Sequence, residues 1–380
     1  MSPKVAFITG GNGITGSAIL EHLVKKTDST EWSKIIVTSR SPFQAAVEDD
    51  RITFVPLDYT QEVQTLIDAM LPACSGVTHA FFSSYIHRDG FEALNVANHG
   101  LFKNFLDSLL EVAPNLECCL LQTGGKHYNV HLGPVPSPAR EEEPRRDSPI
   151  GNFYYQQEDY LFEKQQGATW RWNVVRPEAI IGATPKPNGM NEALTIAFYF
   201  IVCKEMGIEA KMPSNKRYWD GHDDASDARL VADLSIWAST HPHAGNQAFN
   251  VTNGDYFSWR YMEPRLAAYF GASASSEQTF ATPHPTEGGP CLDLSLSQWS
   301  QDKRQVWERI CHRANLPEAS STWDAGTWAF QDWVFQRTWC ATLSMNKARE
   351  FGWTGYMDSY KSFTDAFKQL EKQGVLPKSN

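Results

Sequence analysis

The chain has 380 residues, a formal net charge of -10 and 42% hydrophobic residues. This length allows one large α/β domain with an added lobe, and the negative charge disfavours a nucleic-acid partner, whose phosphates it would repel. No stretch approaches 18 uninterrupted apolar residues, and no basic leader precedes an apolar block, so we expect a cytoplasmic protein without a membrane span. Seven cysteines without a CxxC pair fit a reducing compartment.

The N-terminal half alternates short apolar runs with stretches of helical periodicity. The apolar runs predict buried strands over residues 5–9, 34–40, 52–58, 78–85, 116–124 and 170–182. Helical spacing of apolar residues predicts helices over residues 14–26, 60–70, 93–112 and from residue 152 onward. This alternation is typical of right-handed βαβ units, so we predict the α/β class with a Rossmann-type doubly wound parallel sheet.

The rhythm breaks at residues 131–151, which are rich in proline and charge and predict an exposed loop. After the sixth predicted strand the alternation weakens. One apolar helix is expected at 193–207, one more strand at 248–254, and then an aromatic, helical remainder.

The stretch TGGNGITG (9–16) lies between the first predicted strand and the first predicted helix. Gly10 permits a tight turn, Gly13 lets backbone N–H groups approach a pyrophosphate, and Gly16 allows the helix to pack on the strand. The helix N-terminus adds positive potential. The pattern therefore predicts a dinucleotide site, against the alternative of a purely structural glycine turn.

The end of the second predicted strand indicates which dinucleotide binds. An NAD site places a carboxylate there to accept from the ribose 2′-hydroxyl, but this chain has Ser39 and Arg40. Because an arginine pairs with a 2′-phosphate, we predict NADP(H), the alternative being a solvated surface arginine. Asp58 ends the third strand, where it would meet the adenine or cap the helix that follows.

These features predict two units. The dinucleotide-binding domain covers residues 1–182 and is completed by about 225–253. A smaller, mostly helical lobe that covers the substrate is assigned to residues 183–224 and 254–380.

The stretch NFYYQQED (152–159) raises a question about catalysis. Reductases of this kind usually carry tyrosine and lysine as YxxxK on one helix face, but Glu158 follows Tyr154 at that spacing. Lys126 comes directly after the fifth strand, in QTGGKHY (122–128), where α/β folds build their sites. We expect this lysine to approach the Tyr154 hydroxyl from its separate stretch. Otherwise Tyr154 is a core aromatic and Lys126 a surface residue.

The pair TGGKHY and NFYYQQED resembles the progesterone 5β-reductase/iridoid synthase (PRISE) family of atypical short-chain dehydrogenases. Further stretches similar to that family are VTHAFFSSYIHR (77–88), WNVVRPEAIIG (172–182), MNEALTIAFYFIVCKE (190–205), ASDARLVADLSIWA (225–238), NQAFNVTNGDYFSW (246–259) and LSMNKAREFGW (343–353). The resemblance thus extends from the glycine loop nearly to the C-terminus.

The resemblance implies NADPH-dependent 1,4-reduction of an α,β-unsaturated carbonyl. Tyr154 would donate a hydrogen bond to the developing enolate oxygen, and Lys126 would hold the tyrosine and the cofactor ribose. The implied partner is a small apolar carbonyl substrate, and a homodimer is plausible by resemblance alone. Direct carbonyl reduction, a cyclase and a cofactor-sensing protein on the same fold are the alternatives.

The resemblance also implies ligand contacts, residue by residue. The cofactor-binding set is Gly10, Asn12, Gly13, Ile14, Gly16, Arg40, Asp58, Tyr59, Ser84, Tyr85, Gln122, Lys126, Tyr154, Ile180, Asn188, Gly189 and Met190. The substrate-binding set is Tyr85, Phe153 and Ala179.

Several positions depart from the family's pattern. Tyr85 stands where tryptophan is usual, Ala179 where asparagine is common, Gly125 where arginine is common, and Ser39 where a second arginine is usual. Because Tyr85 and Ala179 should border the substrate pocket, we expect a substrate other than progesterone or the iridoid dialdehyde. The charged loop at 139–147 also differs from plant members.

Two histidines offer other chemistry. His127, beside Lys126, is expected to pack or cap rather than act as a base. His222 with Asp220, Asp223 and Asp224 has the composition of a metal site, but we expect a solvated acidic turn and no metal.

Overall fold

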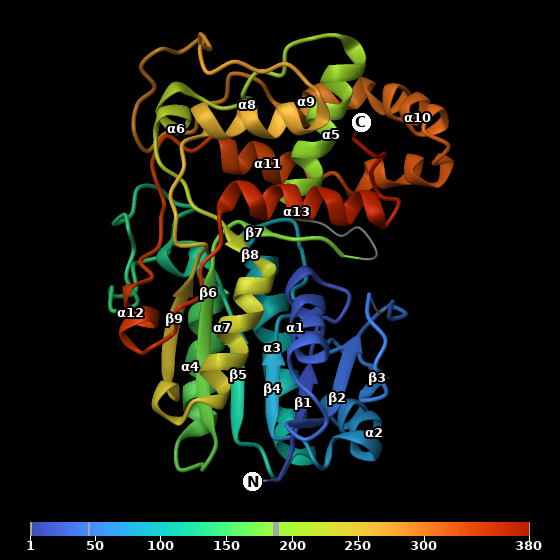
Figure 1. Cartoon of the computed structure of the whole chain (residues 1–380). Coiled ribbons are helices and arrows are strands. Elements are labelled where there is room, and N and C mark those ends of the chain that lie inside the picture. Colours follow the sequence, from blue (N-terminus) through green and yellow to red (C-terminus); the bar gives the residue numbers. More distant parts are fainter. Residues whose placement is uncertain (1, 45, 185–189, 380) are drawn as a thin grey trace.

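The computed structural model describes residues 2–44, 46–184 and 190–379. Seven parallel strands form one sheet in the order β3–β2–β1–β4–β5–β6–β9 (Figure 1). These strands are β1 Lys4–Ile8, β2 Trp32–Ser39, β3 Ile52–Pro56, β4 His79–Phe82, β5 Cys118–Gln122, β6 Arg171–Pro177 and β9 Gln247–Val251. The order reverses between β1 and β4, which confirms the predicted Rossmann-type doubly wound sheet.

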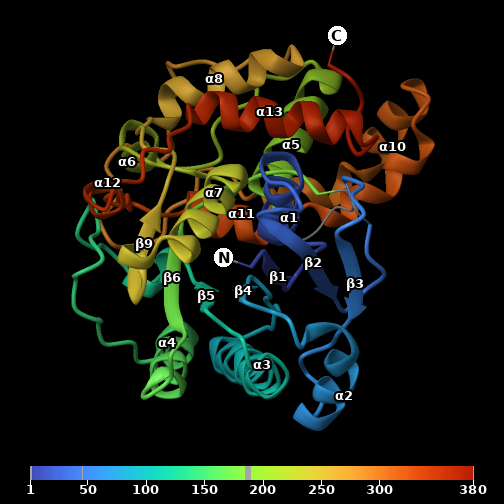
Figure 2. The ribbon, with the colours of Figure 1, turned by 60° about the horizontal axis from the view of Figure 1, so that its bottom comes forward.

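Helices cover both faces of the sheet (Figure 2). One face carries α1 Ile14–Lys26 and α7 Ala228–Thr240. The other carries α2 Val63–Cys74, α3 Phe91–Val112 and α4 Phe153–Gln165. Because neither face meets water, the central strands are continuous apolar runs, and Cys118 and Cys119 of β5 are buried free thiols.

The sixth strand differs from its predicted extent. It ends at Pro177 rather than at residue 182, because Ala179 takes a φ of +44° and turns the chain away from the sheet. The residues that follow form the two-residue strand β7 Ile180–Ile181, which pairs with β8 Ser226–Asp227. This turn lies at the carboxyl edge of the sheet, beside the end of β5.

The lobe lies beyond the carboxyl ends of the strands (Figure 1). Its helices are α5 Glu192–Met206, α6 Lys216–Asp220, α8 Trp259–Phe270, α9 Leu296–Trp299, α10 Arg304–Arg313, α11 Trp328–Phe335 and α13 Ser359–Lys372. They enclose a separate aromatic core in which Phe198 packs on Trp307 and Trp323 at centroid distances of 4.7 and 5.4 Å. Seven of the 13 tryptophans of the chain lie in this core or pack against it.

The C-terminal segment returns to the sheet before it ends in the lobe. Met345, Ala348 and Trp353 are buried in the core between the sheet, α1 and α7, and α12 Asn346–Glu350 contacts β9. The Trp353 indole donates a 2.7 Å hydrogen bond to Asp233 of α7. The division into two units stays a prediction. It assigned residues 345–353 to the lobe, whereas these residues pack on the sheet.

The charged loop at 131–151 is largely exposed and has no helix or strand, as predicted. Ala139 is its buried point, where an isolated bridge to Leu343 joins the loop to the C-terminal segment. No helix in the described part of the chain is long and apolar enough to cross a membrane.

Candidate active site

The glycine loop between β1 and α1 is closed tightly. Gly10 has a φ of +66°, and its carbonyl accepts a 2.7 Å hydrogen bond from the Gly13 amide. A Cβ on Gly16 would lie 2.3 Å from the Gly10 oxygen, so no side chain fits there. Gly13 caps α1, which begins at Ile14, and the open helix N-terminus fits a pyrophosphate.

A second set of contacts joins this loop to the end of β2. The Asn12 side-chain amide donates to the Ser39 hydroxyl at 2.8 Å and to the Ser41 hydroxyl at 3.0 Å. Arg40, between the two serines, is exposed. The arrangement leaves the guanidinium at the sheet position where this fold binds the adenosine ribose.

Asp58 and Tyr59 follow β3. The Asp58 carboxylate accepts from the Thr60 amide at 3.1 Å and hydroxyl at 2.8 Å, so it caps the turn that precedes α2. Tyr59 is buried, and its hydroxyl bonds Thr38 at 2.9 Å. Its ring therefore belongs to the core, and its backbone is the part that a nearby adenine would meet.

The carboxyl ends of β4 and β5 supply further polar groups. Ser84 and Tyr85 follow β4 and are half-buried. At the end of β5, Gln122 Oε1 and Thr123 Oγ1 are buried without a hydrogen-bond partner among the described residues. Such atoms cost about 1–3 kcal/mol each when unsatisfied, so they fit a polar ligand. Together with the glycine loop, these groups fit a nicotinamide dinucleotide.

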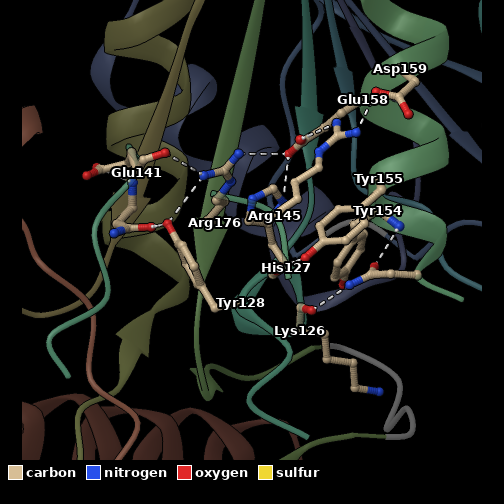
Figure 3. Close-up of polar contacts among 12 residues, drawn as sticks. Lys126, His127, Tyr128, Glu141, Arg145, Tyr154, Tyr155, Glu158, Asp159 and Arg176 are labelled. Carbon is tan, nitrogen blue, oxygen red and sulfur yellow. Dashed lines mark hydrogen bonds and ion pairs between the residues drawn. The ribbon is translucent and has the colours of Figure 1, made fainter. Parts of the chain in front are cut away.

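Asn152 brings the stretches of Lys126 and Tyr154 together. It caps α4, its side-chain oxygen accepting from the Tyr154 amide at 3.1 Å, while its NH₂ group donates to the Lys126 carbonyl at 2.8 Å (Figure 3). The Tyr154 hydroxyl lies 3.4 Å from the position that a Cβ on Gly124 would take. The phenol thus stands at the end of β5, directly before the turn that carries the lysine.

The two functional groups themselves are not bonded. Among the described residues, no hydrogen bond joins Lys126 Nζ to the Tyr154 hydroxyl, and the ammonium lies 5.4 Å from the ring centre of Trp333 on α11. The two stretches lie side by side, but the predicted approach of the ammonium to the Tyr154 hydroxyl stays a prediction, and Trp333 is a contact that the sequence did not indicate.

Burial controls the protonation of this pair. It raises the pKa of Tyr154 well above its ordinary value, with a smaller contribution from Tyr85. Burial likewise raises the pKa of Tyr85 to about 12 and lowers that of Lys126. The Tyr154 phenol is therefore neutral at neutral pH and able to donate a hydrogen bond.

Aromatic side chains stand beside Tyr154. Phe153 lies 4.3 Å from the Tyr154 ring centre and 6.1 Å from that of Tyr85. Ala179 and Ile180 are half-buried at the end of β6, and Met190 is exposed. The predicted contacts at Asn188 and Gly189 lie outside the described residues.

A cluster of buried acids joins the sheet edge to the lobe. Glu178, directly after β6, lies 3.3 Å from Arg337 and fills the space that a side chain on Gly125 would need, since a Cβ there would meet its carboxyl carbon at 3.1 Å. Burial raises the pKa of Glu178 to about 8, and that of Glu192 on α5 to about 7. Both carboxyl groups therefore tend to retain protons at neutral pH.

The prediction of a solvated acidic turn at residues 220–224 is wrong in part. Asp223 and Asp224 are buried, because the lobe packs over them; Asp223 lies 3.5 Å from Arg337, and Asp224 accepts from the Leu343 amide at 2.9 Å. Only His222 and Asp220 of the predicted turn reach solvent. No group of three or more potential metal ligands is assembled within the described residues.

Of the residues that sequence reasoning missed, Asn152 had a readable signal, because an asparagine directly before a helix is a common N-cap. Trp333, Arg337 and Glu178 had none. Their contacts depend on how the lobe docks on the sheet.

A Rossmann sheet with this glycine loop, and with a tyrosine and a lysine at its carboxyl edge, defines an oxidoreductase of the short-chain dehydrogenase/reductase superfamily. Residues 6–311 match the family model of the PRISE-like Rossmann-fold domain. The chain belongs to this family, as the sequence resemblance predicted.

Relatives match over nearly the whole chain. The short chain dehydrogenase gsfE of Penicillium aethiopicum is 56% identical, covering 99% of this chain and 100% of its own. An (S)-8-oxocitronellyl enol synthase of Nepeta cataria is 35% identical (98% and 93% covered), and the 3-oxo-Delta(4,5)-steroid 5-beta-reductase of Arabidopsis thaliana is 33% identical (98% and 92% covered).

Solved structures share the fold at low sequence identity. A UDP-glucose 4-epimerase from Thermotoga maritima superposes with a TM-score of 0.64 at 15% identity, covering 97% of this chain and 99% of its own. The terminal R domain of the myxalamid biosynthetic pathway gives 0.65 at 14% identity, covering 100% and 93%. These likenesses support the fold alone.

Proposed function

We propose that this protein is an NADPH-dependent reductase of the C=C bond of α,β-unsaturated carbonyl compounds, with Tyr154 and Lys126 as its catalytic residues. The observation that carries the proposal is the Asn152 bridge, which holds the lysine turn against the helix of Tyr154 at the end of β5. The names of the Nepeta and Arabidopsis relatives are consistent with enal and enone chemistry.

Tyr154 is the hydrogen-bond donor in this proposal. Bound NADPH would supply a hydride to the β-carbon, negative charge would develop on the substrate's carbonyl oxygen, and a proton from water would complete the saturated product at the α-carbon. The neutral phenol donates to that oxygen, an interaction worth on the order of 3 kcal/mol in the transition state. Its raised pKa keeps the phenol neutral, so that it can donate this hydrogen bond.

Lys126 acts through its charge. Its ammonium lies between the turn after β5 and the ring of Trp333, where burial strengthens its field. In the proposed complex it bonds the cofactor ribose and stabilises charge that develops near Tyr154. The expected result of Lys126→Met is weaker cofactor binding together with slower turnover.

The preference for NADPH over NADH rests on Arg40. The guanidinium is exposed at the end of β2, and the flanking residues are serines rather than carboxylates. Asn12 fixes that segment by bonds to both serines. Arg40→Ala should raise the KM for NADPH about tenfold and leave that for NADH nearly unchanged, since only the 2′-phosphate contact is lost.

The proposed substrate is a small apolar carbonyl compound. Phe153 and Tyr85 provide apolar surface beside Tyr154, and the proposal assigns Ala179, which follows β6, to the same pocket. The short side chain of Ala179 and the phenol of Tyr85 differ from the family's usual asparagine and tryptophan. They are the positions at which we expect substrate choice to be set.

The test is NADPH oxidation with a panel of enals, cyclic enones and steroidal enones, followed by identification of the product. Tyr154→Phe should lower kcat roughly 100-fold on the best substrate. Tyr160→Phe is the matched control, because it also removes a tyrosine hydroxyl from α4. That hydroxyl donates to Asp107, away from the carboxyl edge of the sheet. Full turnover by Tyr154→Phe would refute the site, and an allylic alcohol as product would assign direct carbonyl reduction instead.

A further inference from the structure

The helix position from which a YxxxK lysine would act is occupied by Glu158. Residues four apart lie on one helix face, so Glu158 lies one helical turn after Tyr154 on the same face. Its carboxylate is almost completely buried, at 2% exposure. A buried carboxylate requires partners, and this one has three cationic or titratable neighbours.

Those neighbours come from three different parts of the chain (Figure 3). Glu158 pairs with Arg176 of β6 at 3.0 Å and with Arg145 of the charged loop at 3.2 Å, and it lies 3.2 Å from His127 Nδ1. Burial opposes its ionisation, but His127 and Arg176 outweigh that effect and lower its pKa to about 2. The group is a fixed negative charge under ordinary conditions.

His127 connects this charge to the lysine turn. It directly follows Lys126 in the short helical turn Gly125–Tyr128, and burial lowers its pKa. Its carbonyl accepts a 2.7 Å hydrogen bond from the Tyr155 hydroxyl. With the Asn152 bond to the Lys126 carbonyl, two hydrogen bonds hold the turn to α4, and His127 Nδ1 lies 3.2 Å from Glu158 outside hydrogen-bond geometry.

The far side of the same turn is fixed as well. Tyr128 donates a 2.6 Å hydrogen bond to Asn250 of β9 and accepts one at 3.3 Å from Arg176. Arg176 therefore contacts both Glu158 and the last residue of the turn. Figure 3 shows the Lys126 side chain extending away from this cluster.

We propose that Glu158 is a positioning residue that acts through His127 to hold the Gly125–Tyr128 turn against α4, so that Lys126 is presented beside Tyr154. Where a YxxxK protein has its lysine on the helix, this chain has Glu158. Its lysine, Lys126, lies on the turn that Glu158 holds in place. The role rests on the proposed function of Lys126. It goes beyond that proposal because it assigns a role to Glu158, four positions after Tyr154.

The test is a double-mutant cycle between Glu158→Gln and Lys126→Met, measured first as the Kd for NADPH by fluorescence. We expect Glu158→Gln to raise the Kd about tenfold in the wild-type chain and less than twofold in the Lys126→Met chain, because the ammonium it positions is then absent. Asp159→Asn is the matched control, since the neighbouring carboxylate also pairs with Arg145, at 2.6 Å, but is exposed. If Glu158→Gln raised the Kd for NADPH by the same factor in both backgrounds, or if Asp159→Asn had the same effect, the positioning role of Glu158 would be overturned.

A second pair of variants protects the test against misfolding of Glu158→Gln. His127→Asn retains a donor near the Nδ1 position and should keep NADPH affinity within about threefold of wild type, whereas His127→Leu should match Glu158→Gln. Equal affinity of the asparagine and leucine variants would contradict a role through His127. Turnover of the panel of enals, cyclic enones and steroidal enones is measured in parallel: if wild type reduces none of them while the binding cycle is non-additive, the proposed reaction fails and the positioning role stands.

Discussion

Gly16→Ala is expected to weaken both the fold and cofactor binding, although Gly16 lies within a helix where alanine is normally the better residue. Helix propensity alone favours alanine over glycine by about 1 kcal/mol. At Gly16, however, the new Cβ would lie 2.3 Å from the Gly10 carbonyl oxygen and 2.7 Å from its carbon. These are backbone atoms of the phosphate loop, so relief requires the loop or the helix to move.

The size of the effect follows from that contact. Ordinary van der Waals contact begins near 3.4 Å, so the loop must retreat by about 1 Å. Strain of this kind costs about 1–3 kcal/mol. The same shift lengthens hydrogen bonds to the pyrophosphate beyond useful range, and one such bond to a charged group is worth about 1.5–3 kcal/mol. The Kd for NADPH should therefore rise at least about tenfold.

Gly100→Ala in α3 is the matched control, because nothing lies within 4 Å of the Cβ that it would add. This variant should be more stable than wild type by about 0.5–1 kcal/mol and bind NADPH normally. Urea unfolding followed by circular dichroism and NADPH fluorescence supply the two measurements. If Gly16→Ala were as stable as Gly100→Ala and bound NADPH like wild type, the steric reasoning would be refuted.

Three further outcomes are expected. The raised pKa values of Glu178, about 8, and Glu192, about 7, mean that the folded chain binds more protons than the unfolded chain between about pH 4.5 and 8. Stability should therefore fall as pH rises through that window, by several kcal/mol, and Glu178→Gln should flatten the profile; an unchanged slope would contradict the assignment. Gly125→Ala should cost about 1–2 kcal/mol in the wild-type chain but little when Glu178 is also alanine, as read from urea midpoints, so equal costs in both would exclude the contact. Asn152→Asp keeps the helix cap but places a carboxylate oxygen, which cannot donate, against the Lys126 carbonyl. It should therefore lower NADPH turnover more than Asn152→Ala does, although the aspartate caps α4 better. The reverse ranking would contradict the role of Asn152 in joining the two stretches.

The parts of the fold that the sequence predicted are those with short-range causes. A strand, a glycine turn and an amphipathic helix lie together in residues 4–26, so both the first βα unit and its phosphate loop could be predicted. The position of the Lys126 turn against the start of the Tyr154 helix could also be predicted, because parallel strands present their carboxyl ends at one edge.

The parts that could not be predicted depend on docking of the lobe. Trp333 meets Lys126, and Arg337 meets Glu178, across more than 150 residues of chain. Asp223 and Asp224 look like a hydrated turn in the sequence, since nothing local marks them as buried. Glu158 was noticed only as a missing lysine, because its partners come from a loop, a turn and a strand that no local pattern connects.

The return of residues 345–353 to the sheet has a consequence for synthesis of the protein. While the chain emerges from the ribosome, every strand of the nucleotide-binding sheet is available by Val251, but the apolar core beside α7 that Trp353 joins lacks this segment for about another hundred residues. The core beside α7 is therefore completed only after most of the lobe has been made, and a nascent or truncated chain that stops before this segment exposes apolar surface to chaperones and proteases.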